Sequence, residues 1–412
     1  MMALEGPFLA AIIARLPDPK FNLAAYGVAF AFALLVEAPV IMMMSASTAL
    51  VEDAPSYRKL RNFTYGLNAI LTGGMLLLVV PPVGEFVLET LIGLPHEVAR
   101  LTYWSLLILL PWPAAIGYRR FYQGLLIRGG RTRLVAYGTM IRLVAMSSTA
   151  FVVFKFTSIS GAYLGAAALS VAVCVEAVAS RIMVRGTLRR LLSIHADETK
   201  VTLDYRRIRH FYIPLALTSV IGLAVHPMIT FFLGRAPYPV ESLAVLPVVN
   251  SLSFIFRALG LSFQEVGIVL MGEDYENIRE LSRFALVLGT AASLALALIA
   301  FTPFVHVWFE TISGLSPELA AFAIAPARIL APLPGLTVLL TFERAILVQR
   351  RSTRPITVAT AIEVTGIILT LMALVHFFGM VGATAAAVAF VAGRLGANIF
   401  LATRCVRALR PD

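Results

Sequence analysis

The sequence predicts an all-α membrane protein with twelve transmembrane helices in two six-helix lobes, which are related by a parallel repeat. Three observations predict this class: a composition too apolar for water, about twelve apolar stretches of membrane-spanning length, and a self-similarity at a shift of 220 or 221 residues. Hydrophobic residues make up 59% of the chain and charged residues only 14%, and the mean hydropathy is +0.85. Soluble domains carry about 25% charged residues, so this composition predicts that most of the chain lies in a lipid bilayer.

The two halves of the chain resemble each other at fixed positions. Residues 15–24 (RLPDPKFNLA) and 235–244 (RAPYPVESLA) share an arginine, two prolines, a leucine and an alanine at a shift of 220. Residues 111–113 (PWP) recur at a shift of 221 as residues 332–334 (PLP). A register kept over so long a span indicates an internal duplication, which is common in membrane transporters.

Each apolar stretch is expected to be a helix, because lipid offers no partners to unpaired backbone groups. In the first half the expected spans are residues 1–14, 24–50, 62–91, 101–127, 134–155 and 160–184. In the second half they are residues 208–234, 242–271, 284–308, 318–348, 355–378 and 380–403.

Basic residues gather in the loops that follow even-numbered helices and in the central linker. The positive-inside rule therefore places both termini and the linker in the cytoplasm, and the six helices of each copy give both copies the same topology. We predict an N-terminal lobe (1–184), a basic cytoplasmic linker (185–207), a C-terminal lobe (208–403) and a cytoplasmic tail (404–412). The expected location is the plasma membrane, as a multi-pass protein of a bacterial inner membrane.

The first predicted helix is short. Its fourteen residues rise only about 21 Å, against roughly 30 Å of hydrocarbon, and it lacks about eleven residues that the seventh helix has on its cytoplasmic side. We expect a first helix truncated there, because the chain starts downstream of its native start or is clipped. A short re-entrant first helix is the alternative.

Charged residues inside a membrane are costly and indicate function. Glu37 in the second helix has Arg257 as its repeat equivalent, and Arg142 in the fifth helix has Glu363. These opposite charges are predicted to pair across the two lobes and to act in gating. In the alternative reading each charge pairs within its own lobe, for example Arg257 with Glu265 eight residues later.

A second charge cluster lies on the fourth and tenth helices, which are repeat equivalents. It comprises Arg119 and Arg120 in one helix and Glu343 and Arg344 in the other, each preceded by a proline pair that is expected to kink the helix beside a water-filled cavity. The arginines could instead extend to the headgroups. Arg328 adds another cation, and a cationic interior suits an anionic solute or headgroup.

These observations assign the candidate residues to two roles. The substrate-binding residues are Arg257, Arg344, Arg119, Arg120 and Arg328. The gating or coupling residues are Glu37, Arg142, Glu265, Glu343, Glu363 and His226, of which His226 could carry a proton or simply pack.

Other motifs carry little chemistry. The six histidines lack metal-ligand spacing and no nucleophile lies in a catalytic setting, so we expect no enzymatic activity, no metal and no cofactor. The net charge of +11 is explained by topology and by contact with lipid headgroups rather than by nucleic-acid binding. Gly129 and Gly130 suggest a tight turn more than a phosphate loop. We expect a monomer.

Residues 212–235 (YIPLALTSVIGLAVHPMITFFLGR), 326–336 (PARILAPLPGL) and 379–387 (GMVGATAAA) resemble the multidrug/oligosaccharidyl-lipid/polysaccharide (MOP) exporter superfamily. This superfamily includes the multidrug and toxic compound extrusion (MATE) transporters, and the closest likeness is to the progressive ankylosis (ANK) family. The resemblance implies alternating access and export of anionic metabolites such as citrate, nucleotides or pyrophosphate, coupled to a proton or sodium ion.

Two alternative functions remain within this resemblance. One is a cation-coupled MATE multidrug exporter, but such exporters commonly have an acidic residue in helix 1 or helix 7. Here helix 7 has none and helix 1 has only Glu5, near its end. The other is a flippase for an anionic lipid-linked head group, which needs the same cationic cavity.

Overall fold

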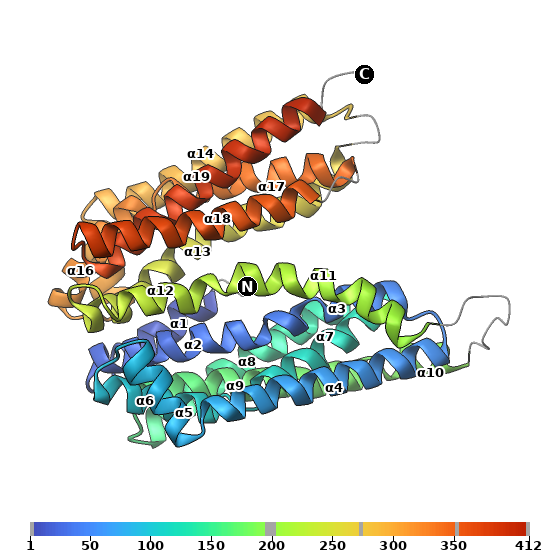
Figure 1. Cartoon of the computed structure of the whole chain (residues 1–412), viewed down its shortest axis with the longest axis horizontal. Coiled ribbons are helices and arrows are strands. Elements are labelled where there is room, and N and C mark those ends of the chain that lie inside the picture. Colours follow the sequence, from blue (N-terminus) through green and yellow to red (C-terminus); the bar gives the residue numbers. More distant parts are fainter. Residues whose placement is uncertain (1–3, 194–202, 272–274, 351–353, 409–412) are drawn as a thin grey trace. The chain divides into compact units, whose positions relative to one another are not determined.

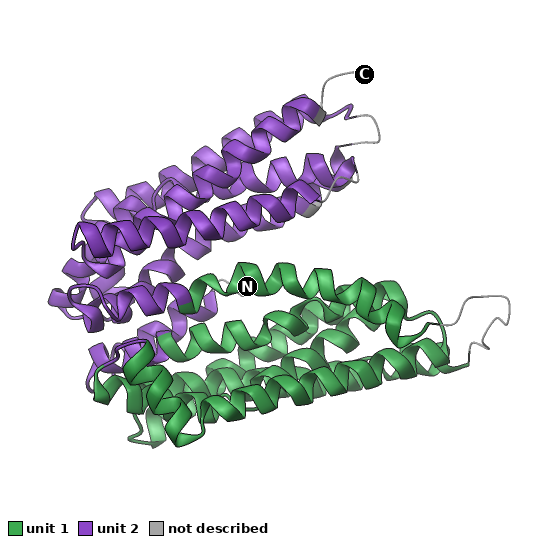
Figure 2. Ribbon diagram, in the orientation of Figure 1, with its two compact units in different colours: residues 1–2, 28–91, 95–227 green, residues 3–27, 92–94, 228–412 purple. Residues whose placement is uncertain are grey.

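The computed structural model describes residues 4–193, 203–271, 275–350 and 354–408, and within these ranges every regular element is a helix (Figure 1). This confirms the predicted all-α class. The chain divides into two compact units (Figure 2). Unit 1 comprises residues 1–2, 28–91 and 95–227, and unit 2 comprises residues 3–27, 92–94 and 228–412.

The helices of unit 1 are most of α2 (Pro19–Ile41), α3 (Met43–Leu50), α4 (Ala54–Leu78), α5 (Pro81–Glu85), the π-helix η2 (Phe86–Leu91), α6 (His96–Ile108), α7 (Trp112–Arg128), α8 (Thr132–Phe156), α9 (Gly161–Met183), α10 (Arg185–Leu192) and α11 (Tyr205–Leu223). Those of unit 2 are α1 (Glu5–Ile13), most of α12 (Val225–Leu233), α13 (Pro239–Leu270), α14 (Ile278–Phe301), α15 (Phe304–His306), the π-helix η3 (Val307–Ile312), α16 (Pro317–Ile329), α17 (Leu333–Gln349), α18 (Arg354–Met372), the π-helix η4 (Ala373–Phe377) and α19 (Gly382–Ala408).

Among the described residues, 9 helices are long and apolar enough to cross a membrane, or up to 11 if each bent pair is one span. The bent pairs are 54–78 with 81–91, at 74°, and 317–329 with 333–349, at 40°. The predicted count of twelve is therefore not reached, because α1 has only 9 residues. Its repeat equivalent α12 has 9 residues as well, but it follows directly on α11.

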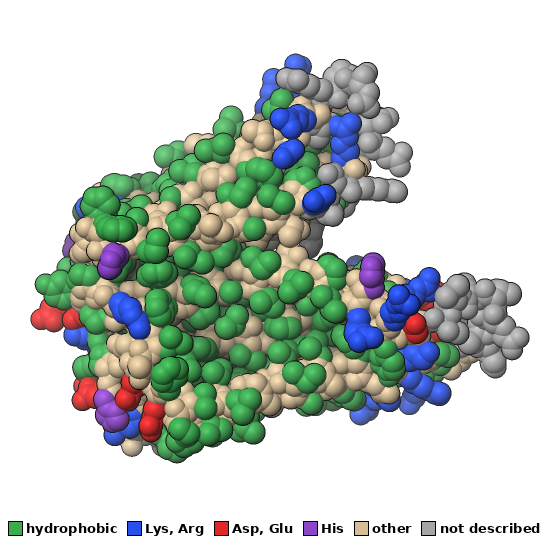
Figure 3. All heavy atoms as spheres, viewed as in Figure 1, with side chains coloured by type: hydrophobic (Ala, Val, Ile, Leu, Met, Phe, Trp, Pro, Cys, Tyr) green, Lys and Arg blue, Asp and Glu red, His purple; other side chains and the backbone are tan. Residues whose placement is uncertain are grey.

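The distribution of apolar and basic side chains in each unit is typical of a membrane protein. Apolar side chains cover the flanks of the long helices, and basic side chains gather at one end, beside α10 in unit 1 and beside the end of α19 in unit 2 (Figure 3). The multi-pass character of the prediction agrees with this distribution. Which end faces the cytoplasm stays a prediction.

The internal repeat extends to the backbone. Asp18 and Tyr238, which are repeat equivalents, both adopt a left-handed conformation with φ of 51° and 54°, each between two prolines. Gly93 and Gly314, equivalent at a shift of 221, have φ of 82° and 74°. A non-glycine residue with positive φ is uncommon, so two at equivalent positions indicate that both copies make the same turn.

Two equivalent arginines tie the copies together inside unit 2. The Arg15 guanidinium donates hydrogen bonds to the carbonyls of Thr311, at 2.6 Å, and Ile312, at 3.0 Å. The Arg235 guanidinium donates to the carbonyl of Ile92 at 2.9 Å. Each arginine thus satisfies carbonyl groups at the end of a π-helix in the other copy, where the helix leaves them without partners.

Residues at equivalent or neighbouring positions of the two copies also contact each other inside unit 2. The ammonium of Lys20 lies 2.5 Å from a carboxylate oxygen of Glu241, which directly follows Val240, the repeat equivalent of Lys20. Gly27 packs against its own equivalent, Pro247, and a Cβ added to Gly27 would lie 2.6 Å from the Pro247 Cγ. Both contacts belong to unit 2.

We expect Gly27→Val to destabilise the protein by about 1–3 kcal/mol, the cost of overpacking a tight contact. The matched control is Gly73→Val on α4, where an added Cβ meets nothing within 4 Å. Thermal unfolding of the purified protein in detergent measures both. Equal losses would mean that helix propensity, rather than contact with Pro247, explains the effect.

Helix α11 is part of the unit 1 core. Tyr212 packs edge-on against Phe63 of α4, with ring centroids 5.4 Å apart. Its hydroxyl donates a hydrogen bond to the carbonyl of Pro39. That carbonyl lies just before the break between α2 and α3 at Met42, and a break of this kind leaves carbonyls without intrahelical partners. Tyr212 therefore stabilises the kinked helix that carries Glu37.

Candidate functional site

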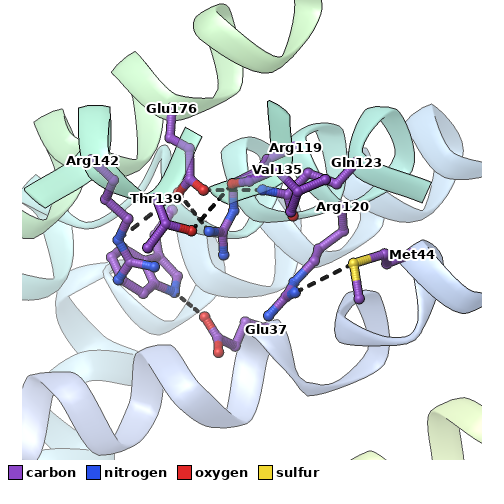
Figure 4. Close-up of polar contacts among 10 residues, drawn as sticks. Glu37, Met44, Arg119, Arg120, Gln123, Val135, Thr139, Arg142 and Glu176 are labelled. Atoms are coloured by element: carbon purple, nitrogen blue, oxygen red, sulfur yellow. Dashed lines mark hydrogen bonds and ion pairs between the residues drawn. The ribbon is translucent and has the colours of Figure 1, made fainter. Parts of the chain in front are cut away.

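The interior of unit 1 holds a cluster of charged side chains from four neighbouring helices (Figure 4). Its centre is the carboxylate of Glu176 on α9, which is fully buried. Arg119 of α7 donates to one oxygen at 2.5 Å and Gln123 donates to the other at 3.0 Å. Arg142 of α8 lies 4.0 Å from the first oxygen. Figure 4 shows Glu176 pointing between these three side chains.

Burial makes this pairing obligatory. The Arg119 side chain is 2% exposed and that of Glu176 0%, so each charge has lost its hydration and depends on the other. Removing one member of such a pair leaves an uncompensated buried charge. Arg119 is thus held as part of the protein interior, and its guanidinium is already paired with a carboxylate.

Glu37 of α2 is held beside this cluster by Trp112. The indole N–H of Trp112 donates to a Glu37 carboxylate oxygen at 2.6 Å, and the Arg142 guanidinium lies 5.9 Å from the Trp112 ring centroid. Trp112 is the first residue of α7 and lies between the two prolines of the repeated motif. The proline pair therefore fixes the start of the helix that positions Glu37, Arg119 and Arg120.

Arg120 differs from its neighbour Arg119. Its guanidinium lies 3.8 Å from the Met44 sulfur, which is a weak acceptor (Figure 4). It interacts electrostatically with Glu37 and Glu176, but no described carboxylate lies within ion-pair distance of it. The side chain is half-buried, and its Nε has no hydrogen-bond partner among the described residues.

Unit 2 contains a second ion pair. Arg394 of α19 lies 2.7 Å from a carboxylate oxygen of Glu363 on α18. It also donates to the Thr337 hydroxyl of α17 at 2.9 Å. The three helices are adjacent, so this pair holds together the core of unit 2 as Arg119 and Glu176 hold that of unit 1.

The two ion pairs have reversed polarity. In unit 1, α8 carries Arg142 and α9 carries Glu176; in unit 2 the equivalent helices α18 and α19 carry Glu363 and Arg394. The two charges that we expected to meet across the lobes thus each lie beside an opposite charge of their own unit. Antiparallel neighbours such as α8 and α9 bring these side chains within reach of each other, and pairing across the lobes stays a prediction.

Two further arginines of unit 2 have incomplete sets of partners. Arg344 donates to the Thr360 hydroxyl at 3.2 Å. Arg257 interacts electrostatically with Arg394 and Glu363, but no described carboxylate lies within ion-pair distance of it. Both side chains are half-buried, and the Nε atoms of both lack a hydrogen-bond partner among the described residues.

Of the remaining predicted site residues, Glu343, Arg328 and Glu265 belong to unit 2, and His226 belongs to unit 1. Glu343 is buried on α17 beside Arg344, with 3% exposure. Arg328 donates to the Ala300 carbonyl at 3.1 Å, at the end of α14, where a cation is favoured. His226 lies half-buried in the first turn of α12. The side chain of Glu265 lies outside the part that the structure describes.

Sequence reasoning missed five members of these clusters: Glu176, Gln123, Trp112, Arg394 and Thr337. Glu176 and Arg394 each stand in a long apolar span, and a charge in such a place is a signal by itself. The uncharged members carry no comparable signal. Among the described residues no group of three or more histidine, cysteine or acidic side chains could hold a metal ion.

Solved structures with similar folds are transport proteins. A multidrug resistance MATE family transporter of the MOP superfamily, in an inward-facing conformation, matches with a TM-score of 0.78 and 16% identity, over 98% of this chain and 94% of that one. The lipid II flippase MurJ, in an inward closed conformation, matches with a TM-score of 0.77 and 14% identity, over 99% and 87%.

A MOP superfamily transporter from Pyrococcus furiosus, described as having a binding pocket of reverse polarity that suggests a different function, matches with a TM-score of 0.59 and 14% identity, over 99% of this chain and 96% of that one. No protein-family model matches the sequence, and no curated protein sequence matches it either. At these identities the likeness establishes the fold, which is the MATE-like fold that we predicted. The likeness to the ANK family stays a prediction.

Proposed function

We propose that this protein is a secondary transporter that exports an anionic organic solute by alternating access, and that it is not an enzyme. The MATE-like fold supports transport, because the similar structures are a MATE transporter and a lipid flippase. The substrate class rests on the chain's own charges. Citrate, nucleotides and pyrophosphate are the anions we expect, with a proton or sodium ion as the coupling ion.

One observation carries the proposed substrate class. Arg120, Arg257 and Arg344 are half-buried inside apolar spans without a carboxylate partner among the described residues, whereas Arg119 and Arg394 are paired. A charged arginine side chain is costly in a membrane interior, so its presence there indicates a function. Carboxylates and phosphates match the planar guanidinium fork, so an anionic solute would supply the acceptors that the protein leaves out.

The local charge balance supports the same conclusion in each unit taken alone. The unit 1 cluster sets Arg119, Arg120 and Arg142 against Glu37 and Glu176. The unit 2 cluster sets Arg257, Arg344 and Arg394 against Glu343 and Glu363. Among the described side chains of these clusters, arginines outnumber glutamates in both, so each cluster attracts anions and disfavours organic cations. This weighs against a multidrug exporter of cationic drugs.

A flippase for an anionic lipid-linked head group is the second candidate. Similarity to the lipid II flippase favours it, and the same arginines would bind a pyrophosphate-linked head group. The two candidates differ in the hydrophobic tail of the ligand. A soluble anion that is transported without a lipid tail would favour the exporter.

Ligand-induced stabilisation of the purified full chain tests the substrate class. We expect citrate, ATP or pyrophosphate to raise the melting temperature in detergent, because a ligand that binds only the folded state stabilises it by mass action. Ethidium is the matched organic cation and should leave the melting temperature unchanged. A rise with ethidium alone would contradict the proposed class.

The predicted pairing of Glu37 with Arg257 across the two lobes is tested by exchanging the charges. We expect the double variant Glu37→Arg with Arg257→Glu to recover more transport than either single variant, because only the double variant restores opposite charges. Initial rates in proteoliposomes, compared as a double-mutant cycle, measure the coupling. Additive losses would show that the two charges do not act on each other.

A further inference from the structure

A pocket lies at the end of unit 1, outside the charge clusters of its interior. Its volume is about 250 Å³. The polar side chains that line it are Glu52, Arg128, Arg131, Thr187 and Arg190. The positive-inside rule predicts that this end of the unit lies at the cytoplasmic surface of the membrane.

The turn between α7 and α8 builds one wall of the pocket. The N–H of Arg131 donates to the Leu126 carbonyl at 2.8 Å and that of Gly130 to the Ile127 carbonyl at 3.0 Å. Gly130 has φ of 70°, so this is a glycine-terminated helix end of the Schellman type. Because these backbone N–H groups are used within the turn, any anion here must be bound by side chains.

Helix α10 builds the opposite wall and is a short basic amphipathic helix. Leu188 and Leu191 are buried in the core cluster of unit 1, while Arg189 and Arg190 are exposed. Gly129 lets α10 approach α7, since a Cβ added there would lie 2.5 Å from the Thr187 Cγ2. Helices of this composition lie at the membrane interface and attract anionic headgroups.

The side chains around the pocket have more hydrogen-bond donors than the acceptors beside them can use. Arg128 donates to the Thr48 carbonyl at 2.8 Å and lies 3.7 Å from a Glu52 carboxylate oxygen. Among the described residues that line the pocket, Glu52 is the only acidic one, against three arginines. The buried Thr187 hydroxyl has no hydrogen-bond partner among the described residues.

We propose that this pocket binds a phosphate ester anion, held by Arg131 and Arg190 with Arg128 and Thr187 beside them. Guanidinium groups bind phosphate oxygens in a bidentate fashion and a hydroxyl adds one more donor. The phosphate can belong to a membrane lipid headgroup or to a soluble phosphate ester. This site is separate from the proposed transport function and does not depend on it.

The test is binding of two probes to the purified full chain: phosphatidylglycerol in detergent micelles, followed by native mass spectrometry, and glycerol phosphate, followed by calorimetry. We expect the double variant Arg131→Gln with Arg190→Gln to weaken binding of the preferred probe at least about tenfold. The reason is that it removes charge-assisted hydrogen bonds to the phosphate, which are stronger than neutral ones. The matched control is Arg185→Gln with Arg189→Gln, which removes two exposed arginines from α10 outside the pocket.

The two probes distinguish the sources of the phosphate. Binding of phosphatidylglycerol alone assigns the pocket to a lipid headgroup, and competition by glycerol phosphate assigns it to a soluble ester. Melting temperatures of all variants verify folding. Equal weakening by both double variants would overturn the proposal, because general surface charge would then explain binding, and so would the absence of binding of either probe.

Discussion

Glu176→Gln is expected to destabilise the protein by about 3–5 kcal/mol, the cost of breaking a buried ion pair by removing one partner. The fully buried carboxylate accepts from Arg119 at 2.5 Å and from Gln123 at 3.0 Å. Without its charge the Arg119 guanidinium stays buried and uncompensated. Chemical or thermal unfolding of the purified protein in detergent measures the loss.

A control and a rescue make this prediction specific. Glu318→Gln, in the exposed first turn of α16, should change stability by less than about 0.5 kcal/mol. Replacing both partners, as Arg119→Met with Glu176→Met, should recover part of the loss, because an apolar pair carries no unpaired charge. If Glu176→Gln were no worse than Glu318→Gln, the pair would not hold the interior of unit 1.

Arg257→Ala is expected to weaken binding of an anionic solute by about 1.5–3 kcal/mol, the scale of a hydrogen bond to a charged group. That is a loss of about tenfold to a hundredfold in affinity. The reason is that Arg257 has no carboxylate partner among the described residues, so its removal deletes a donor without exposing a buried anion. Titration with citrate or ATP measures the change.

Arg404→Ala is the matched control, because Arg404 is an exposed arginine that lies over the Phe400 ring near the end of α19. It should leave anion affinity unchanged. Any movement of organic cations that the unaltered protein supports should be no slower in Arg257→Ala. Loss of cation transport with intact anion binding would show that the role assigned to Arg257 is wrong.

Much of the fold follows from composition and repetition alone. Long apolar segments and the shift of 220 or 221 residues predict helical spans in two equivalent sets. Among the described residues, nine of the predicted spans have counterparts of membrane-spanning length, or eleven if each bent pair is one span. The bends were less predictable. A single span was expected over residues 62–91, but the chain turns by 74° where Pro81 and Pro82 follow α4, since proline cannot continue the hydrogen-bond ladder.

The candidate site was predicted only in part. Mid-span charges led to Glu37, Arg142, Arg257 and Glu363, because a charge in an apolar segment is visible in the sequence. Which charges meet depends on the rotation of each helix about its axis, which the sequence pattern fixes poorly when apolar residues surround the helix. The contacts of Glu176 with Arg119 and of Arg394 with Glu363 therefore emerged only from the structure.

Transport by proteoliposomes tests the central claim most directly. Purified full chain is reconstituted, and the initial rates of citrate, ATP and ethidium movement are compared under imposed sodium and proton gradients. The account predicts movement of at least one of the two anions, slowed by Arg257→Ala, and no protein-dependent movement of ethidium. Gradient-driven movement of ethidium with neither anion transported would contradict it.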